Sequence, residues 1–184
     1  TQEAEDFIKE VPDELPFMGT SCCPAWSAMA KKLFPDHANC ISMALTPMTL
    51  TARLIKHEHP KAKVVFIGPC AAKKLEAMRK SVRSEVDFVL TFEEMAGIFD
   101  AKHLDLTTIE EDPNGVNDAS ADGRNFAVSG GVAQAVVDVI KARHPDREIQ
   151  VTSAEGLREC RKMLSAAIAG KYPCLLYTSD AADE

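Results

Sequence analysis

The stretch Thr20-Ser21-Cys22-Cys23-Pro24-Ala25-Trp26 places two adjacent cysteines between an apolar run and an amphipathic segment. The run Leu15–Met18 predicts a short buried strand, and the apolar spacing over 24–34 predicts a helix with Pro24 in its first turn. Both thiols therefore lie where a strand passes to a helix N-terminus, the usual place for ligand chemistry in an α/β sheet. The positive end of the helix dipole at this point favours a thiolate.

The same arrangement occurs a second time around Cys70. The β-branched and aromatic run Val64–Ile67 predicts a strand, Gly68-Pro69-Cys70 follows it, and an amphipathic segment begins directly afterwards. Cys70 therefore also stands at the carboxyl end of a strand and the start of a helix. Two sites built alike predict thiolates that converge on one soft metal centre.

Composition excludes several classes of function. The chain has 184 residues, enough for one domain or two small lobes, and it has no apolar run approaching 18 residues, which argues against a membrane span. Its net charge is −7 and its basic residues are scattered, which argues against a nucleic-acid partner. Six cysteines are too few for a secreted disulfide scaffold and favour a reduced cytoplasm. Because the chain begins at Thr1, we expect a fragment, and the absence of a signal peptide carries little weight.

Strands alternate with helices along the chain, which predicts an α/β protein with mostly parallel sheets. Thr91 and Glu94 predict a capping box that opens a helix over 92–99. Thr152 and Glu155 are expected to cap the last helix, and the polar segment 109–124 predicts a long loop. The expected strands are 15–18, 64–67, 87–90 and 148–152.

The end of the chain departs from this pattern. Residues 173–184 have no periodicity and resemble a translated sequencing-adapter read. We therefore expect a partial domain over 1–172 followed by a non-native tail, and we assign Cys174 no function.

Three motifs together resemble the catalytic domain of the iron-only (FeFe) hydrogenases, in the order of that family. They are the double-cysteine stretch Thr20–Trp26, the stretch Gly68-Pro69-Cys70-Ala71-Ala72-Lys73-Lys74-Leu75-Glu76, and Ser129-Gly130-Gly131-Val132. The resemblance covers 3–170. It implies two lobes of small, mostly parallel sheets flanked by helices, truncated at the C-terminus, with a catalytic cluster in the cleft between the lobes.

The family implies a 4Fe–4S cubane joined through a cysteine sulfur to a di-iron centre that carries CO and cyanide. By resemblance, Cys23 and Cys70 match two of the four cubane ligands, and thiolates suit such a cluster. Cys22 matches a cysteine that passes protons to the di-iron site. Lys73 matches a lysine that contacts a cyanide of the di-iron unit.

Other residues are carried over by the same resemblance. Ser42 matches a proton-path serine, and Glu76 matches a neighbour of a proton-path glutamate. Glu3 and Asp6, three apart on one helix face, match the outer carboxylates of that path. The remaining cofactor-binding expectations are Pro69, Phe126 and Val132.

This sequence also departs from the family. Gly68 stands where the commonest second motif has Met, and Met48 stands where the best-known members carry a polar residue. Both changes would alter the surroundings of the cluster and so its potential or catalytic bias. The third motif, a Cys-x-x-x-Cys pair with the other two cubane ligands, is absent. We therefore expect the polypeptide as written to be inactive and its gene to encode an active enzyme.

Structural roles remain open for most of these residues. Cys22 and Cys23 alone could be small buried residues, Lys73 a solvated helix lysine, and Glu76 a solvated or capping residue. Gly130 and Gly131 could simply allow a tight turn before a helix. Ser42 could also have only a structural role. For Cys40 and Cys160 we expect a structural role alone.

The expected activity is the reversible formation of H₂ from protons and electrons, with ferredoxin or another electron carrier as partner. The resemblance also implies maturation proteins that build the cluster, and an anaerobic bacterium as host. Two alternatives are a hydrogenase-like protein of cytosolic iron–sulfur assembly and a sensory hydrogenase. Assembly relatives lack the proton-relay cysteine, and sensory relatives alter the cysteine pair, so Cys22, Cys23 and Lys73 favour the enzyme. The direction of catalysis does not follow from sequence.

Overall fold

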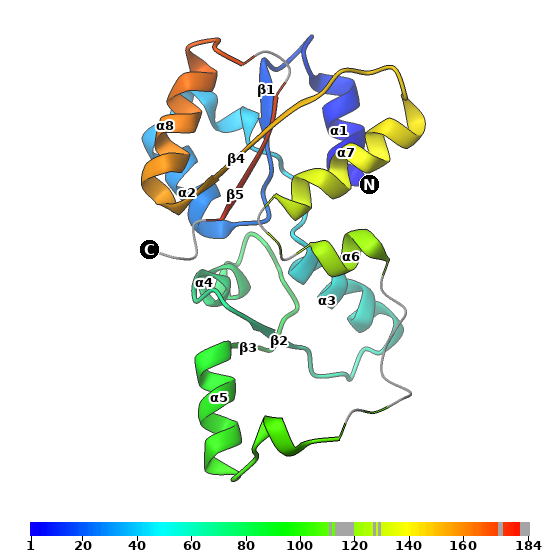
Figure 1. Cartoon of the computed structure of the whole chain (residues 1–184), viewed down its shortest axis with the longest axis vertical. Coiled ribbons are helices and arrows are strands. Elements are labelled where there is room, and N and C mark those ends of the chain that lie inside the picture. Colours follow the sequence, from blue (N-terminus) through cyan, green and yellow to red (C-terminus); the bar gives the residue numbers. More distant parts are fainter. Residues whose placement is uncertain (111, 113–119, 127, 129, 173–174, 181–184) are drawn as a thin grey trace. The chain divides into compact units, whose positions relative to one another are not determined.

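The computed structural model describes residues 1–110, 112, 120–126, 128, 130–172 and, for the backbone alone, 175–180. The chain forms two compact units (Figure 1). Unit 1 comprises Thr1–Thr46 and Ser120–Glu184, and unit 2 comprises Pro47–Ala119. Each unit is described separately below.

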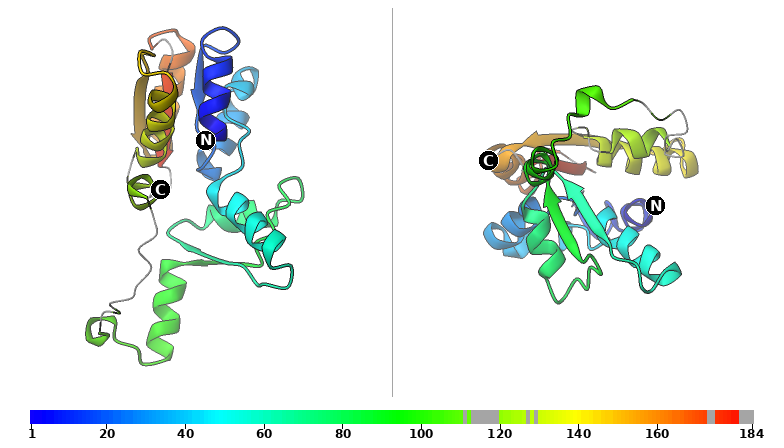
Figure 2. Two further views of the ribbon diagram at one scale, coloured as in Figure 1. Left: turned by 90° about the vertical axis from the view of Figure 1, so that its right-hand side faces the viewer. Right: turned by 90° about the horizontal axis from the view of Figure 1, so that it is seen from below.

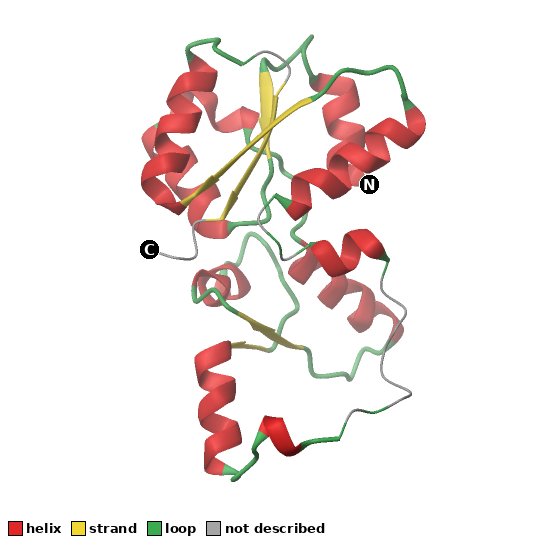
Figure 3. Ribbon diagram, viewed as in Figure 1, coloured by secondary structure: helices red, strands yellow, loops and turns green. Residues whose placement is uncertain are grey.

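Unit 1 contains a three-stranded parallel sheet with the strand order β1-β5-β4. In Figure 1, helices α2 and α8 lie on one side of these strands and α1 and α7 lie on the other. Figure 3 shows the same helix–sheet–helix arrangement by secondary structure. The elements are α1 (Gln2–Glu10), β1 (Phe17–Gly19), α2 (Pro24–Leu33), η1 (Pro35–Cys40), α6 (Ala121–Asn125), α7 (Gly131–Arg143), β4 (Gln150–Glu155), α8 (Gly156–Ile168) and β5 (Leu175–Asp180).

The main hydrophobic core of the described residues lies in unit 1. Phe7 of α1, Phe17 of β1, Trp26 of α2, Ile140 of α7 and Leu164 of α8 are all essentially inaccessible to solvent. Each comes from a different element, so burial of these side chains fixes the helices against the sheet. Two cysteines expected to be structural, Cys40 and Cys160, are buried in this core.

Unit 2 contains a two-stranded parallel sheet, β2-β3, whose strands lie side by side in the right-hand view of Figure 2. Val65 pairs with Phe88 and Ile67 with Leu90, so these four side chains share one face. Val65 and Ile67 are each 46% exposed and Phe88 is 60% exposed, so the described residues leave this apolar face largely uncovered. The elements are α3 (Pro47–Glu58), β2 (Val65–Gly68), α4 (Ala72–Met78), β3 (Phe88–Thr91), α5 (Phe92–Ala101) and η2 (Leu106–Thr108).

The expected fold class is confirmed, because parallel strands alternate with helices in two small sheets. The predicted capping box is also confirmed: Glu94 N–H donates to Thr91 Oγ1, and Thr91 N–H donates to a carboxylate oxygen of Glu94. In the described part of the chain, every helix is too short or too polar to cross a bilayer.

Three expectations need correction. The loop predicted over 109–124 contains helix α6, which Ser120 caps by accepting a hydrogen bond from Gly123 N–H. Thr152 cannot cap α8, because β4 continues through it to Glu155, and in the described structure the Glu155 side chain makes no capping hydrogen bond. The list of expected strands omits Leu175–Asp180, which forms the central strand β5. The strand reads Leu-Leu-Tyr-Thr-Ser-Asp, which has neither a strict alternation nor an apolar run of four residues, so its sequence pattern does not predict a strand.

Candidate active site

The double-cysteine motif forms the turn between β1 and α2, as the sequence predicts. Cys23 is the N-cap residue of α2, and its Sγ accepts a hydrogen bond from Trp26 N–H at 3.5 Å. Pro24 occupies the first helical position, where its missing N–H costs no hydrogen bond. Cys22 Sγ lies 3.8 Å from Thr20 Oγ1. Both thiols are half-buried, so they are held by the turn and still reachable.

The buried side chain of Trp26 holds this turn in place. Its ring is fully buried, and its Nε1–H donates to the Thr20 carbonyl at 3.1 Å. Gly19, which precedes Thr20, allows the close packing, since a Cβ there would lie 2.9 Å from Ile41 Cδ1 and 3.3 Å from Trp26 Cζ2. The single tryptophan therefore fixes the backbone that carries the two cysteines.

A carboxylate from α1 reaches the same turn. Ser21 N–H donates to Glu3 Oε1 at 3.0 Å, and the Ser42 side chain also hydrogen-bonds to Glu3. Burial raises the pKa of Glu3 above its usual value, and the hydrogen bonds from Ser21 and Ser42 partly oppose this by stabilising the carboxylate. Within unit 1, Glu3 thus contacts the backbone of Ser21, the residue that precedes Cys22 in the chain.

Ser42 is itself fixed by its neighbours. Its N–H donates to the Gly19 carbonyl at 2.8 Å, and its Oγ accepts from Ala44 N–H at 3.1 Å. Ser21 Oγ in turn donates to the Ala44 carbonyl at 2.9 Å. The structure therefore brings together two residues expected on the proton path, Glu3 and Ser42. Both are linked to Ser21, the residue before Cys22.

The second cysteine motif lies in unit 2, between β2 and α4. Cys70 is half-buried, and its carbonyl accepts a hydrogen bond from Lys73 N–H at 3.2 Å in the first turn. The motif thus has the strand-to-helix position that the sequence predicts. Pro69 is exposed at the end of β2.

Lys73 and Glu76 form a buried ion pair on α4. Lys73 Nζ lies 2.8 Å from Glu76 Oε2, and the two side chains are only 13% and 5% exposed. The other carboxylate oxygen, Oε1, accepts a hydrogen bond from Thr49 Oγ1 at 3.4 Å. The solvated-lysine alternative for Lys73 and the solvated alternative for Glu76 are therefore wrong in this structure.

The ring of Phe66 fills the space beside Gly68. A Cβ at Gly68 would lie 2.7 Å from Phe66 Cε1 and 2.9 Å from Phe66 Cζ. The two residues are two apart on β2 and so share a face of the strand. A larger side chain at 68 would require Phe66 to move.

Both glycines of the third motif have a structural reason. Gly130 adopts a left-handed conformation with φ of +81°, at the N-cap of α7. A Cβ at Gly131 would lie 1.9 Å from the Asn125 carbonyl oxygen, so only glycine allows α6 and α7 to approach here. Val132 packs in the first turn of α7, and Phe126 ends α6 half-buried. Ser129 lies outside the described residues.

The family model for the iron-only hydrogenase large subunit, C-terminal domain, matches residues 1–176. The chain belongs to this family.

Two of its relatives are hydrogenases. Iron hydrogenase 1 of Clostridium pasteurianum is 29% identical over 180 residues, which is 86% of this chain and 31% of that protein. The periplasmic Fe hydrogenase large subunit of Nitratidesulfovibrio vulgaris is 27% identical over 169 residues, 79% of this chain and 39% of that protein. The hydrogenase domain described here therefore spans about a third of the length of these relatives.

A third relative has another role. A cytosolic Fe–S cluster assembly factor of Eremothecium gossypii is 34% identical over 86 residues, 47% of this chain and 19% of that protein. The relatives therefore include hydrogenases and an iron–sulfur assembly factor, two of the three classes of protein that the sequence left open.

Solved structures show the same fold. A variant of the FeFe-hydrogenase from Chlamydomonas reinhardtii superposes with a TM-score of 0.69 at 20% identity, covering 98% of this chain and 64% of that chain. An apo form of the enzyme superposes with a TM-score of 0.68 at 21% identity, covering 97% and 63%. At these identities the likeness establishes the fold alone.

The thiols of the hydrogenase domain fit an iron–sulfur cluster in kind, because such clusters are held by cysteine thiolates. Cys23 is in unit 1 and Cys70 is in unit 2, and each is half-buried at a strand-to-helix turn. Within the described ranges, no three or more His, Cys, Asp or Glu side chains gather as a metal site. The ligand roles of Cys23 and Cys70 therefore stay predictions.

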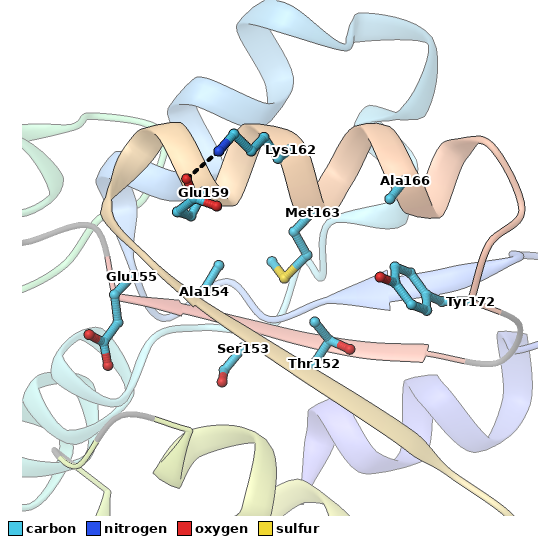
Figure 4. Close-up of a pocket in the computed structure, with 9 residues that line it drawn as sticks. All are labelled: Thr152, Ser153, Ala154, Glu155, Glu159, Lys162, Met163, Ala166 and Tyr172. Carbon is cyan, nitrogen blue, oxygen red and sulfur yellow. Dashed lines mark hydrogen bonds and ion pairs between the residues drawn. The ribbon is translucent and has the colours of Figure 1, made fainter.

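A pocket of about 590 Å³ lies between β4 and α8 of unit 1 (Figure 4). Thr152 and Ser153 line it from the strand, and Lys162 and Glu159 of α8 form an exposed ion pair at its edge. It contains none of the predicted site residues, and no thiol lines it. The pocket therefore gives no support to the predicted site residues.

Sequence reasoning missed Thr49 and the supporting role of Thr20. Thr49 is fully buried in the first turn of α3 and contacts Glu76, 27 residues away. No local pattern links two residues so far apart. Thr20 lay within the motif, but only its contacts with Cys22 and Trp26 reveal its role.

Proposed function

We propose that this chain is part of an iron-only hydrogenase that catalyses reversible H₂ formation, 2H⁺ + 2e⁻ ⇌ H₂. The observation that carries the proposal is the intact Cys22–Cys23 pair, with Cys23 at the N-cap of α2 and Cys22 next to the hydrogen bond between Ser21 and Glu3. A metal-binding role alone would need only the first of these features. A proton-transfer role also needs a carboxylate near the thiol, and Glu3 contacts the backbone of Ser21, the residue before Cys22.

The proposed cofactor is a 4Fe–4S cluster bridged to a di-iron centre with CO and cyanide ligands. When bound, it would supply the electrons and the metal site at which protons and H₂ interconvert. Cys23 and Cys70 would hold the cubane as thiolates. Pro69, Phe126 and Val132 would contribute to the surroundings of the di-iron centre, and the family resemblance supports these assignments.

The chain's own residues would move the proton. Glu3 accepts hydrogen bonds from Ser21 and Ser42, and its raised pKa brings it closer to the range in which a carboxyl can both bind and release a proton. Cys22 would take the proton from this side and donate it toward the cofactor. Asp6, one turn along α1, would be the outer carboxylate of the route, as the resemblance implies.

Lys73 would hold the cofactor through charge. A largely buried ammonium group, held by the Glu76 carboxylate, is well suited to bind an anionic ligand such as cyanide. Glu76 and Thr49 would hold the lysine in position from the opposite side.

The proposed partners follow from this reaction. They are ferredoxin or another electron carrier, the proteins that mature the cluster, and the substrates H₂ and protons. The sparse cysteines support a cytoplasmic location, although one relative is described as periplasmic.

The second candidate is a non-catalytic role in iron–sulfur assembly, which similarity to the Eremothecium gossypii factor favours. It predicts iron binding without H₂ chemistry. The third candidate is a sensory hydrogenase that feeds a regulatory domain.

The test is expression of the full gene with the maturation proteins, under exclusion of oxygen, followed by assay of H₂ evolution with a reduced viologen. We expect activity in the parent, loss of at least 100-fold in C22A with the iron content unchanged, and loss of cluster iron in C23A. C40A is the matched control, because Cys40 is a buried core thiol. Full iron content without H₂ formation in the parent would favour the assembly or sensory role.

We further propose that residues 173–184 are not native. The strand β5 shows that 175–180 fit the central position of the sheet, and it does not address their origin. Sequencing the source DNA past the codon for Tyr172 tests this. A Cys-x-x-x-Cys pair in the continuation would complete four cubane ligands, and its absence would count against the hydrogenase assignment.

A further inference from the structure

Arg147, a residue outside α1, contacts the carboxyl end of this helix. Its Nη1–H donates to the Ile8 carbonyl at 3.2 Å, and its Nη2–H donates to the Val11 carbonyl. The guanidinium also lies over the ring of Phe7, 5.5 Å from the ring centroid. A cation that satisfies the last carbonyls of a helix stabilises that end through both hydrogen bonds and the helix dipole.

The opposite end of α1 carries Glu3, whose carboxylate contacts Ser21 and Ser42. Helix α1 has only nine residues, and helices this short are not stable by themselves in water. Its position therefore depends on its tertiary contacts. Ala4 and Phe7 are buried in the core, but apolar packing is non-directional and tolerates sliding along the helix axis. Directional hydrogen bonds at the carboxyl end fix that axial position.

We propose that Arg147 is a positioning residue that sets the axial position of α1 and thereby keeps the Glu3 carboxylate against the Ser21 amide. No direct contact with the reacting groups is involved. The link to proton transfer rests on the function proposed above, whereas the positional claim stands on the contacts within unit 1 alone.

A second arginine provides a matched control. Arg143 of α7 pairs with Glu5 of α1 at 2.9 Å, but both side chains are about half exposed. Exposed pairs contribute little to stability, and this one contacts a side chain and not the helix carbonyls. Loss of Arg143 should therefore leave α1 where it is.

The test is hydrogen exchange of the Ser21 amide, followed by NMR in the chain itself without any cluster. E3A defines the full loss of protection when the Glu3 acceptor is removed. We expect R147M, which keeps an apolar stem over Phe7, to lower Ser21 protection about tenfold and toward the E3A value. R143M should change it less than twofold. The Phe34 amide, which donates to the Ala30 carbonyl at the end of α2, is the internal reference and should stay within twofold in both arginine variants.

Unchanged protection of Ser21 in R147M overturns the proposal, and so does an equal fall at Ser21 and Phe34, because that would report general destabilisation. If R147M does not fold, the Ser21 protection is measured in R147K instead. A lysine can donate to the two carbonyls only from a single nitrogen, so a fall of at least threefold at Ser21 alone supports the proposal and no change overturns it.

A carboxyl titration of Glu3 by ¹³C NMR separates positioning from stability. The groups that face Glu3 are Ser21 N–H, Ser42, the N-terminal amine and Asp6. If α1 shifts and Glu3 enters water, its pKa should fall toward the ordinary value in R147M, because burial is the main cause of the raised value. A mere loss of stability would leave the Glu3 pKa of the folded chain unchanged. All these measurements are independent of H₂ formation, so an inactive hydrogenase would not affect them.

Discussion

Lys73 Nζ and Glu76 Oε2 are 2.8 Å apart in an ion pair that is almost completely withdrawn from solvent. The pair is unusual for side chains three apart on a short helix, which normally point into water. Thr49 contacts the second carboxylate oxygen, so Glu76 is held between a cation and a hydroxyl. The lysine predicted to bind cyanide is thus held in place by groups of the chain itself.

The first prediction concerns E76Q. Removing one partner's charge from a buried pair typically costs about 3 kcal/mol, because the remaining charge stays desolvated. We expect a loss of that order in the free energy of unfolding of unit 2, measured by far-UV circular dichroism in urea. Tryptophan fluorescence would not serve, since the only tryptophan, Trp26, is in unit 1.

K74Q is the control for E76Q. Lys74 pairs with Glu94, but both side chains are more than a third exposed. Exposed pairs contribute about 0–1 kcal/mol, so K74Q should change unfolding little. An equal loss in the two variants would show that burial of the Lys73–Glu76 pair has no energetic consequence.

The second prediction concerns the glycine that replaces the methionine of the family. In G68M the new side chain collides with Phe66, and overpacking of this kind costs about 1–3 kcal/mol. The double variant F66A/G68M should recover part of the loss, because the alanine makes room. G97M is the control, since nothing lies within 4 Å of a Cβ at Gly97 and a helix former should stabilise α5. Additive effects of F66A and G68M would contradict the packing argument.

Local sequence patterns predicted most elements correctly because the deciding information is local. Pro24 and Cys23 predict the start of α2, and Thr91 with Glu94 predicts the start of α5, from residues no more than three apart. The strand-to-helix position of both cysteine motifs follows from the same kind of signal. The fold class then follows from the alternation of strands and helices.

The errors have non-local causes. The strand β5 is recognised only from its position in the sheet, where it pairs with both β1 and β4. The contact between Thr49 and Glu76, and that between Arg147 and α1, join residues far apart in the chain. In the candidate site, residue types and turns were predictable, whereas the partners that hold Glu3 and Lys73 were not.

The third prediction concerns the uncovered face of the β2-β3 sheet. Parallel sheets are normally covered on both faces, but Val65, Ile67 and Phe88 are about half exposed in the described structure. The chain should therefore bind the dye ANS in its folded state, measured by fluorescence without denaturant. Replacing the three residues together with Thr should lower the ANS signal at least threefold while the circular dichroism of the folded chain is retained. An unchanged signal would place the dye site elsewhere.

The fourth prediction concerns acid stability through Asp87. Lys56 Nζ lies 2.7 Å from one oxygen of Asp87, Lys63 Nζ lies 3.0 Å from the other, and Val64 N–H donates at 2.8 Å. The Lys56 hydrogen bond, followed by those from Val64 and Lys63, holds the pKa of Asp87 far below its usual range.

The sign of the effect follows from proton binding. Between the ordinary pKa of about 3.9 and the lower pKa of the folded chain, the unfolded state binds a proton that the folded state does not. The contribution of Asp87 to stability is therefore fully present above about pH 5 and is lost as the pH falls through this window.

The difference in urea midpoint between the parent and D87N should be largest at pH 7 and should narrow steadily from pH 4 to pH 2.5. K56Q should mimic D87N more closely than K63Q, because Lys56 makes the larger contribution and Lys63 is mostly exposed. A difference that does not change with pH would mean that Asp87 acts through its shape and hydrogen bonds and not through its charge.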